Sequence, residues 1–198
     1  MKFDALVVVG LLVAALPGRL AAAEPVPLIH THAHNDYEHT RPLFDALDQG
    51  FCSVEADIWL VNGQLLVAHS RDKVKPDRTL QALYLDPLRQ RVKKNGGRVY
   101  PNGPEITLLI DLKSSWTNIY PVLRTTLEKY ADVLTTYRDG VKQTNAINVI
   151  LSGNHANEMF AGEATRLASS DGVPPDLDSA APATLVPWIS ADWKRYFA

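Results

Sequence analysis

The segment at residues 53–60, SVEADIWL, carries two carboxylates inside a run of otherwise mainly apolar residues. Alternate residues of a β-strand face the same side, so Glu55 and Asp57 share one face of the strand that this run predicts. Unpaired carboxylates are costly in an apolar environment. The segment therefore predicts a strand that presents two acidic side chains to a functional site rather than to bulk solvent.

Strand and helix signals alternate on both sides of this segment. Helices are expected at 42–47, 79–94, 120–134 and 158–167, and a loop at 173–183. An Asn62-Gly63 turn links the strand at 53–60 to another at 64–68. Further strands are expected at 26–29, 106–112, 146–151 and 185–189. Apolar strands that alternate with helices are typical of an α/β fold with a parallel sheet whose faces are covered.

Polar residues gather where these strands end. The first strand runs into HTHAHND at 30–36, the hairpin at 64–68 is followed by His69, and the strand at 106–112 carries Asp111 just before Lys113. In parallel α/β folds the functional groups gather at the carboxyl ends of the strands. We therefore expect these side chains to meet at one end of the sheet.

The chemistry of this set favours phosphodiester cleavage. Three converging carboxylates, Glu55, Asp57 and Asp111, repel one another unless a cation neutralises them, and Mg²⁺ or Ca²⁺ prefers oxygen ligands. Histidines titrate near neutral pH and suit general acid and base catalysis. A lysine next to a metal stabilises the negative charge that develops on a phosphoryl group.

Five segments together resemble a known superfamily: HAHNDY at 32–37, PLFDAL at 42–47, SVEADIWL at 53–60, LLVAH at 65–69 and LIDLK at 109–113. The sequence resembles the phosphatidylinositol-specific phospholipase C and glycerophosphodiester phosphodiesterase-like superfamily, in the branch of the altered inheritance of mitochondria protein 6 family. The resemblance implies a TIM-like barrel and a phosphoric diester hydrolase that acts on a small-molecule or lipid phosphodiester.

The resemblance also implies a role for each matched residue. His32 and His69 would be the catalytic acid and base, with His34 as a rival to His32. The metal ligands for Mg²⁺ or Ca²⁺ would be Glu55, Asp57 and Asp111. Asn35 and Lys113 would contact the phosphate.

Length and composition set the remaining expectations. The apolar run at 5–17, followed by AAA at 21–23, predicts a signal peptide at 1–23 and a secreted or periplasmic protein, because the run is too short for a stable membrane span. A net charge of −2 argues against nucleic-acid binding.

A (β/α)₈ barrel typically takes about 250 residues, so the barrel domain at 24–198 is expected to be C-terminally incomplete. The single cysteine, Cys52, is expected to be a small buried residue.

Two other functions remain open at this point. One is a metallohydrolase of the amidohydrolase or polymerase-and-histidinol-phosphatase type, in which His32 and His34 bind Zn²⁺ or Mn²⁺ as a His-x-His pair. The other is a non-catalytic protein on a decayed scaffold. The first leaves Glu55, Asp57 and His69 without a role, and the second predicts metal binding or simple folding without turnover.

Overall fold

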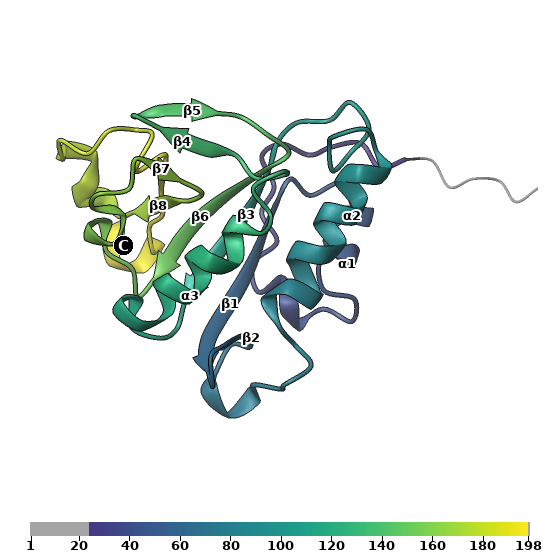
Figure 1. Cartoon of the computed structure of the whole chain (residues 1–198), viewed down its shortest axis with the longest axis horizontal. Helices are drawn as coiled ribbons and strands as arrows, with labels where there is room; N and C mark the ends of the chain where they lie inside the picture. The colour runs from purple at the N-terminus through teal and green to yellow at the C-terminus, as the bar shows by residue number, and fades with distance from the viewer. Residues whose placement is uncertain (1–23, 198) are drawn as a thin grey trace, which may run out of the picture.

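A six-stranded mixed sheet forms the centre of the molecule in the computed structural model, which describes residues 24–197 (Figure 1). The signal peptide expected at residues 1–23 lies outside this range. The strand order is β2-β1-β3-β6-β8-β9, and every neighbouring pair is parallel except β1 and β2. The strands are β1 (Ser53–Val61), β2 (Gln64–Val67), β3 (Ile106–Leu112), β6 (Ile147–Gly153), β8 (Ser169–Gly172) and β9 (Trp188–Ile189).

A second, smaller sheet is antiparallel, with the order β5-β4-β7. Its strands are β4 (Thr136–Arg138), β5 (Val141–Gln143) and β7 (Thr165–Arg166). The α-helices are α1 (Phe44–Asp48), α2 (Asp86–Lys94), α3 (Trp116–Glu128) and α4 (Trp193–Tyr196). A π-helical turn, η3 (Gln81–Leu85), leads into α2, and four 3₁₀ segments are η1 (Asp36–Glu38), η2 (Arg71–Lys73), η4 (Asn157–Phe160) and η5 (Pro174–Asp178).

The two faces of the large sheet differ in chemistry. One face is apolar and is fully buried with side chains of α2 and α3, such as Leu88 and Leu123, in one hydrophobic core. It consists of Val54, Ala56, Ile58, Leu108, Ile110, Leu112, Val149 and Leu151. The other face carries the polar residues of the same strands, namely Ser53, Glu55, Asp57, Thr107, Asp111, Asn148, Ser152, Ser169 and Asp171. We call it the polar face.

The sheet curves strongly enough that its two ends touch across the polar face. Residues 28–33 pair with the start of β1, through the parallel bridges Leu28↔Phe51 and Ala33↔Val54, on the side away from β3. His32 from this segment meets Trp188 of the last strand, β9, edge to face, with ring centroids 5.8 Å apart. The sheet of residues 24–197 is therefore strongly curved, and the closed TIM-like barrel stays a prediction.

Several expected elements differ from the structure. The run at 26–29 forms a single bridge pair, at Leu28, rather than a strand. The helix expected at 120–134 begins earlier and ends earlier, as α3, and includes Pro121 in its interior. The helix expected at 158–167 is wrong, because Gly162 adopts a positive φ of 78° and Thr165 and Arg166 pair with β4. The short strands β4, β5, β7 and β8 were not expected. Cys52 is buried, as expected.

Asp36, next to the expected site residues, holds the start of α1. Its carboxylate is fully buried, and Oδ2 accepts hydrogen bonds from the backbone N–H of Leu43 at 2.6 Å and from the hydroxyl of Tyr84 at 2.8 Å. Leu43 precedes α1 with a strained φ of +66°. Asp36 therefore fixes the path of the chain between the first bridge pairs and α1.

Asp36→Ala should lower the free energy of unfolding by about 3 kcal/mol, because it leaves two buried donors without an acceptor. Asp48→Ala is the matched control: it removes an exposed ion pair with Arg41 and should change stability by less than about 1 kcal/mol. Urea denaturation of both variants measures the difference. Equal losses in the two variants would contradict the role of Asp36.

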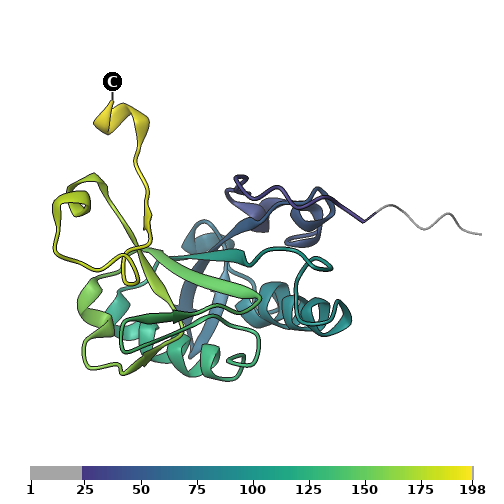
Figure 2. The ribbon, with the colours of Figure 1, turned by 90° about the horizontal axis from the view of Figure 1, so that it is seen from above.

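Among residues 24–197, no helix combines the length and the apolar character needed to cross a membrane. Figure 2 shows the last residues, in yellow, extending away from the sheet.

Candidate functional site

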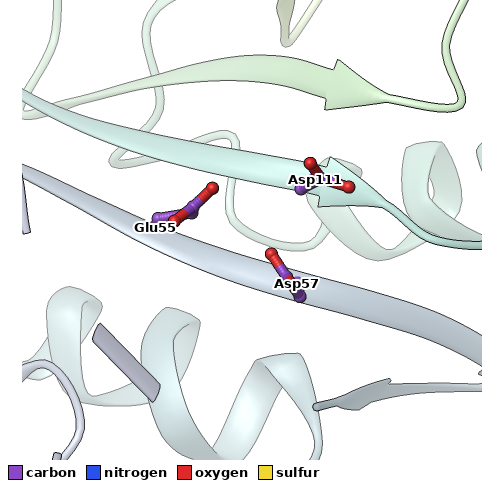
Figure 3. Close-up of side chains that lie close together, drawn as sticks. All are labelled: Glu55, Asp57 and Asp111. Atoms are coloured by element: carbon purple, nitrogen blue, oxygen red, sulfur yellow. The ribbon is translucent and has the colours of Figure 1, made fainter. Parts of the chain in front are cut away.

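Three carboxylates converge on the polar face (Figure 3). Glu55 and Asp57 come from β1 and Asp111 from β3, and one oxygen of each lies within 4.8 Å of the others. The parallel register places Asp57 directly beside Asp111, and the two-residue spacing places Glu55 on the same side as Asp57. The structure thus brings together the three residues expected to bind a metal. We call them the carboxylate cluster.

Lys113 partly neutralises this cluster. Its Nζ lies 3.0 Å from Oδ2 of Asp57 and 3.1 Å from Oδ1 of Asp111. Burial opposes the charged ammonium, but the hydrogen bonds and negative charges of Asp57 and Asp111 outweigh burial and raise the pKa of Lys113. One ammonium among three carboxylates leaves an excess of negative charge. Asp57 is 1% exposed, and its Oδ1 has no hydrogen-bond partner among the described residues.

Glu55 is held from the segment that follows the first bridge pairs. Its Oε2 accepts the backbone N–H of Asn35 at 2.7 Å, and Nε2 of His34 lies 3.5 Å away. Burial raises the pKa of Glu55, and the charges of Asp57 and Asp111 add to this effect, although the N–H of Asn35 and the nearby His34 oppose it. Asn35, which the resemblance assigns to the phosphate, therefore also orients a cluster residue through its backbone.

Tyr37 links the carboxylate cluster to His69. Its hydroxyl lies 2.7 Å from Oδ2 of Asp57, 2.6 Å from Oδ1 of Asn35 and 3.1 Å from Nδ1 of His69. A hydroxyl has one proton to donate, so it donates to one of the two oxygens at a time. Sequence reasoning assigned no role to Tyr37, although it is the last residue of the HAHNDY segment.

His69 follows β2, and its Nδ1 contacts Asp57 and Tyr37. Its Nδ1 lies 3.2 Å from Oδ2 of Asp57, and about half of the side chain is exposed. The ring borders a cleft of about 580 Å³, whose lining includes Tyr37, Lys73, Lys75 and Arg78. Asp57 and Tyr37 therefore fix the Nδ1 side of the imidazole, while the ring remains accessible to a ligand in the cleft.

His32 lies toward the other end of the polar face. Its Nδ1 is 2.8 Å from Oγ of Ser53, and its ring centroid is 6.5 Å from that of His34. Burial lowers the pKa of His32, and the nearby His34 lowers it further. The two candidate catalytic histidines therefore differ in their surroundings. His32 is held by Ser53 and Trp188. His34 is mostly exposed and lies beside Glu55.

Gly153 leaves room for the carboxylate of Asp111. Its φ is +71°, and a Cβ at this position would fall 2.1 Å from Oδ1 of Asp111. A larger residue would therefore displace a member of the carboxylate cluster. Gly153 ends β6, where the register pairs it with Leu112, so it is positioned by the same strand pairing as Asp111.

The family described as "AIM6-like phosphodiesterase domain" matches residues 21–168. The chain belongs to this family. It is 34% identical over 168 residues to "Altered inheritance of mitochondria protein 6" of Eremothecium gossypii, an alignment that covers 74% of this chain and 43% of that protein. It is 36% identical over 150 residues to the protein of the same name from Lachancea thermotolerans, covering 64% and 34% of the two chains. No solved structure matches.

The AIM6-like relatives also correct one expectation. They are named for the inheritance of mitochondria, including the protein of Saccharomyces cerevisiae strain S288c, which is 33% identical over 159 residues. These names do not support export, and the expected secreted or periplasmic location is therefore wrong. The alignments cover 43%, 39% and 34% of these relatives, so the chain spans less than half of their length.

The lowered pKa of His32 predicts how stability depends on pH. The unfolded chain binds a proton at His32 more readily than the folded chain, so acidification below the ordinary histidine value of about 6.5 should destabilise the fold. His32→Asn should make the loss of stability between about pH 7.5 and pH 5 shallower. Thermal unfolding across this range tests this, with exposed His30→Asn as the control. The same pH dependence in wild type and His32→Asn would contradict it.

Proposed function

We propose that this chain is a metal-dependent phosphoric diester hydrolase that uses two histidines as general acid and base. Its membership of a phosphodiesterase domain family supports the reaction class. The convergence of Glu55, Asp57 and Asp111, beside Lys113, is the observation that carries the proposal. The proposal includes the phospholipase C-like superfamily, its TIM-like barrel, and a small-molecule or lipid phosphodiester as substrate.

The residues of the carboxylate cluster fit Mg²⁺ or Ca²⁺. All three donors are oxygens, which hard divalent cations prefer, and Lys113 balances only part of their charge. Oδ1 of Asp57 is buried and has no hydrogen-bond partner within residues 24–197, and a cation would satisfy it. When bound, the metal would supply positive charge that polarises a phosphoryl oxygen.

Lys113 and Asn35 complete the proposed phosphate site. The ammonium of Lys113 is held between Asp57 and Asp111, and it would place a second positive charge beside the phosphoryl group. Asn35 sits with φ +52° at the start of η1, where its backbone N–H is already used by Glu55. Its side-chain amide is the group that would contact the phosphate.

The surroundings of the two histidines favour different tasks. Burial keeps His32 neutral, so it suits the general base that takes the proton of the attacking water or hydroxyl. Asp57, 3.2 Å from Nδ1 of His69, and the hydroxyl of Tyr37, 3.1 Å from the same nitrogen, hold that ring at its Nδ1 side. We assign His69 as the general acid, which would protonate the leaving oxygen through Nε2.

The structure gives less support to the His-x-His metallohydrolase. Among the described residues, the group able to hold a metal consists of three carboxylates without a histidine. Nδ1 of His32 is hydrogen-bonded to Ser53, and the ring of His34 lies beside Glu55. An assay of turnover separates the enzyme from a non-catalytic binding protein.

A paired measurement of activity and metal binding tests the proposal. With Mg²⁺ or Ca²⁺, the chain should hydrolyse bis(p-nitrophenyl) phosphate, and His69→Ala should lower kcat at least about 100-fold while metal still raises the unfolding midpoint. Asp57→Asn should abolish the metal-dependent stabilisation, which is about 2.7 kcal/mol at a hundredfold excess over Kd. His30→Ala, at an exposed position away from the cluster, is the control.

Three results would count against the proposal. Absence of turnover in a folded chain that binds metal would favour the non-catalytic protein. Loss of Zn²⁺ binding in His32→Ala, with Ca²⁺ and Mg²⁺ without effect on stability, would favour the His-x-His metallohydrolase. Equal activity of His69→Ala and His30→Ala would remove His69 from the mechanism.

A further inference from the structure

A fourth acidic side chain, Asp171, lies on the polar face two strands away from Asp111. The register pairs Asp111 with Ser152, and it pairs Leu151 with Ser170, so Asp171 stands level with Ser152 on the next strand. Asp171 in turn pairs with Trp188 of β9. Residues at one level of neighbouring strands point to the same face, so Asp171 faces the same side as Asp111.

The carboxylate of Asp171 is buried and incompletely bonded. The residue is 7% exposed, and its Oδ1 has no hydrogen-bond partner among the described residues. Burial raises its pKa and the charge of Asp111 adds to this, whereas Ser190 and the nearby His155 favour the charged form. An unpartnered acceptor in such a place costs free energy unless a donor reaches it.

Two simpler assignments do not account for Asp171. It lies outside the group of oxygens within 4.8 Å of one another, so it is not a member of the carboxylate cluster. Ser190, next to β9, favours the charged form of Asp171, yet Oδ1 has no hydrogen-bond partner among the described residues. The register places the side chain of Asp171 on the polar face, the same face as the proposed phosphate site.

We propose that Asp171 is a specificity-determining residue that accepts a hydrogen bond from a donor on the alcohol portion of the substrate, a hydroxyl or an ammonium group. This inference rests on the proposed phosphodiesterase function. Neighbouring strands are about 4.8 Å apart, so the Cα atoms of Asp111 and Asp171 are separated by about 10 Å. The phosphate, an alcohol of three or four heavy atoms and its hydrogen bond to Asp171 together span that distance.

Ligand binding without turnover tests this role. Calorimetry with Ca²⁺ and His69→Ala protein compares three methyl phosphodiesters: dimethyl phosphate, methyl glyceryl phosphate with hydroxyl donors, and methyl phosphoethanolamine with an ammonium donor. The last two should bind about tenfold more tightly than dimethyl phosphate. Adding Asp171→Ala should remove this preference and leave the affinity for dimethyl phosphate unchanged.

Asp171→Asn distinguishes the two kinds of donor. The amide oxygen still accepts a hydrogen bond from a hydroxyl but has no charge to attract an ammonium. A hydroxyl donor therefore predicts that the preference for methyl glyceryl phosphate survives in Asp171→Asn, and an ammonium donor predicts that the preference for methyl phosphoethanolamine is lost.

Ser190→Ala is the structural control, because it removes a partner of Asp171 beside β9 and keeps the carboxylate. It should retain the preference. The same loss in Ser190→Ala and Asp171→Ala would assign the effect to the packing of β9 and overturn the inference. Equal binding of all three diesters to His69→Ala would overturn the inference alone, whereas absence of binding by any of them would overturn the proposed function with it.

Discussion

The site depends on holding three carboxylates close together on two parallel strands, β1 and β3. Asp57 and Asp111 are directly paired in the register, so the hydrogen bonds of the sheet bring together two negative charges. Lys113 offsets part of the repulsion, and its backbone N–H bonds to the carbonyl of Ile58 in β1, which fixes the lysine close to the acids it neutralises. Strand pairing therefore positions both the repulsive charges and their counter-charge.

The segment after the first bridge pairs then braces the cluster from one side. The backbone of Asn35 bonds to Glu55, the hydroxyl of Tyr37 bonds to Asp57, and the intervening Asp36 bonds to the backbone of Leu43. Asn35 and Tyr37 thus orient the carboxylate cluster, whereas Asp36 between them holds the start of α1. Because Asp36 fixes the start of α1, the position of Asn35 and Tyr37 depends on the packing of that helix as well as on β1.

The carboxylate cluster was predictable because the sequence pattern of each strand segment indicates which way its acidic side chains face. Two acids at alternate positions inside an apolar strand, and a third acid at the end of another apolar strand, predict a shared face and a shared end of the sheet. Asp171 was not predictable in this way. It lies in SSDG at 169–172, which has no apolar pattern, and only the register with β6 and β9 places it on the polar face. The hairpin of β4 and β5 turns at Asp139-Gly140, a turn signal of the same kind as Asn62-Gly63, but its strands are too short for a period to show.

The polar face buries less apolar surface than the opposite face of the sheet. An α/β sheet ordinarily buries apolar residues on both faces. Here one face is apolar, whereas the opposite face carries mainly hydroxyls, amides and acids, with Leu109 and Ile150 as apolar residues among them. The contact between His32 and Trp188 joins the first bridged segment to the last strand, β9. Asp57 and Asp171 lie on the polar face, and each has a buried oxygen without a hydrogen-bond partner in the part of the chain that the structure describes. A surface with unused acceptors on two separated strands is less favourable empty than filled, which is the physical reason to expect a ligand that carries both a cation-binding phosphate and hydrogen-bond donors.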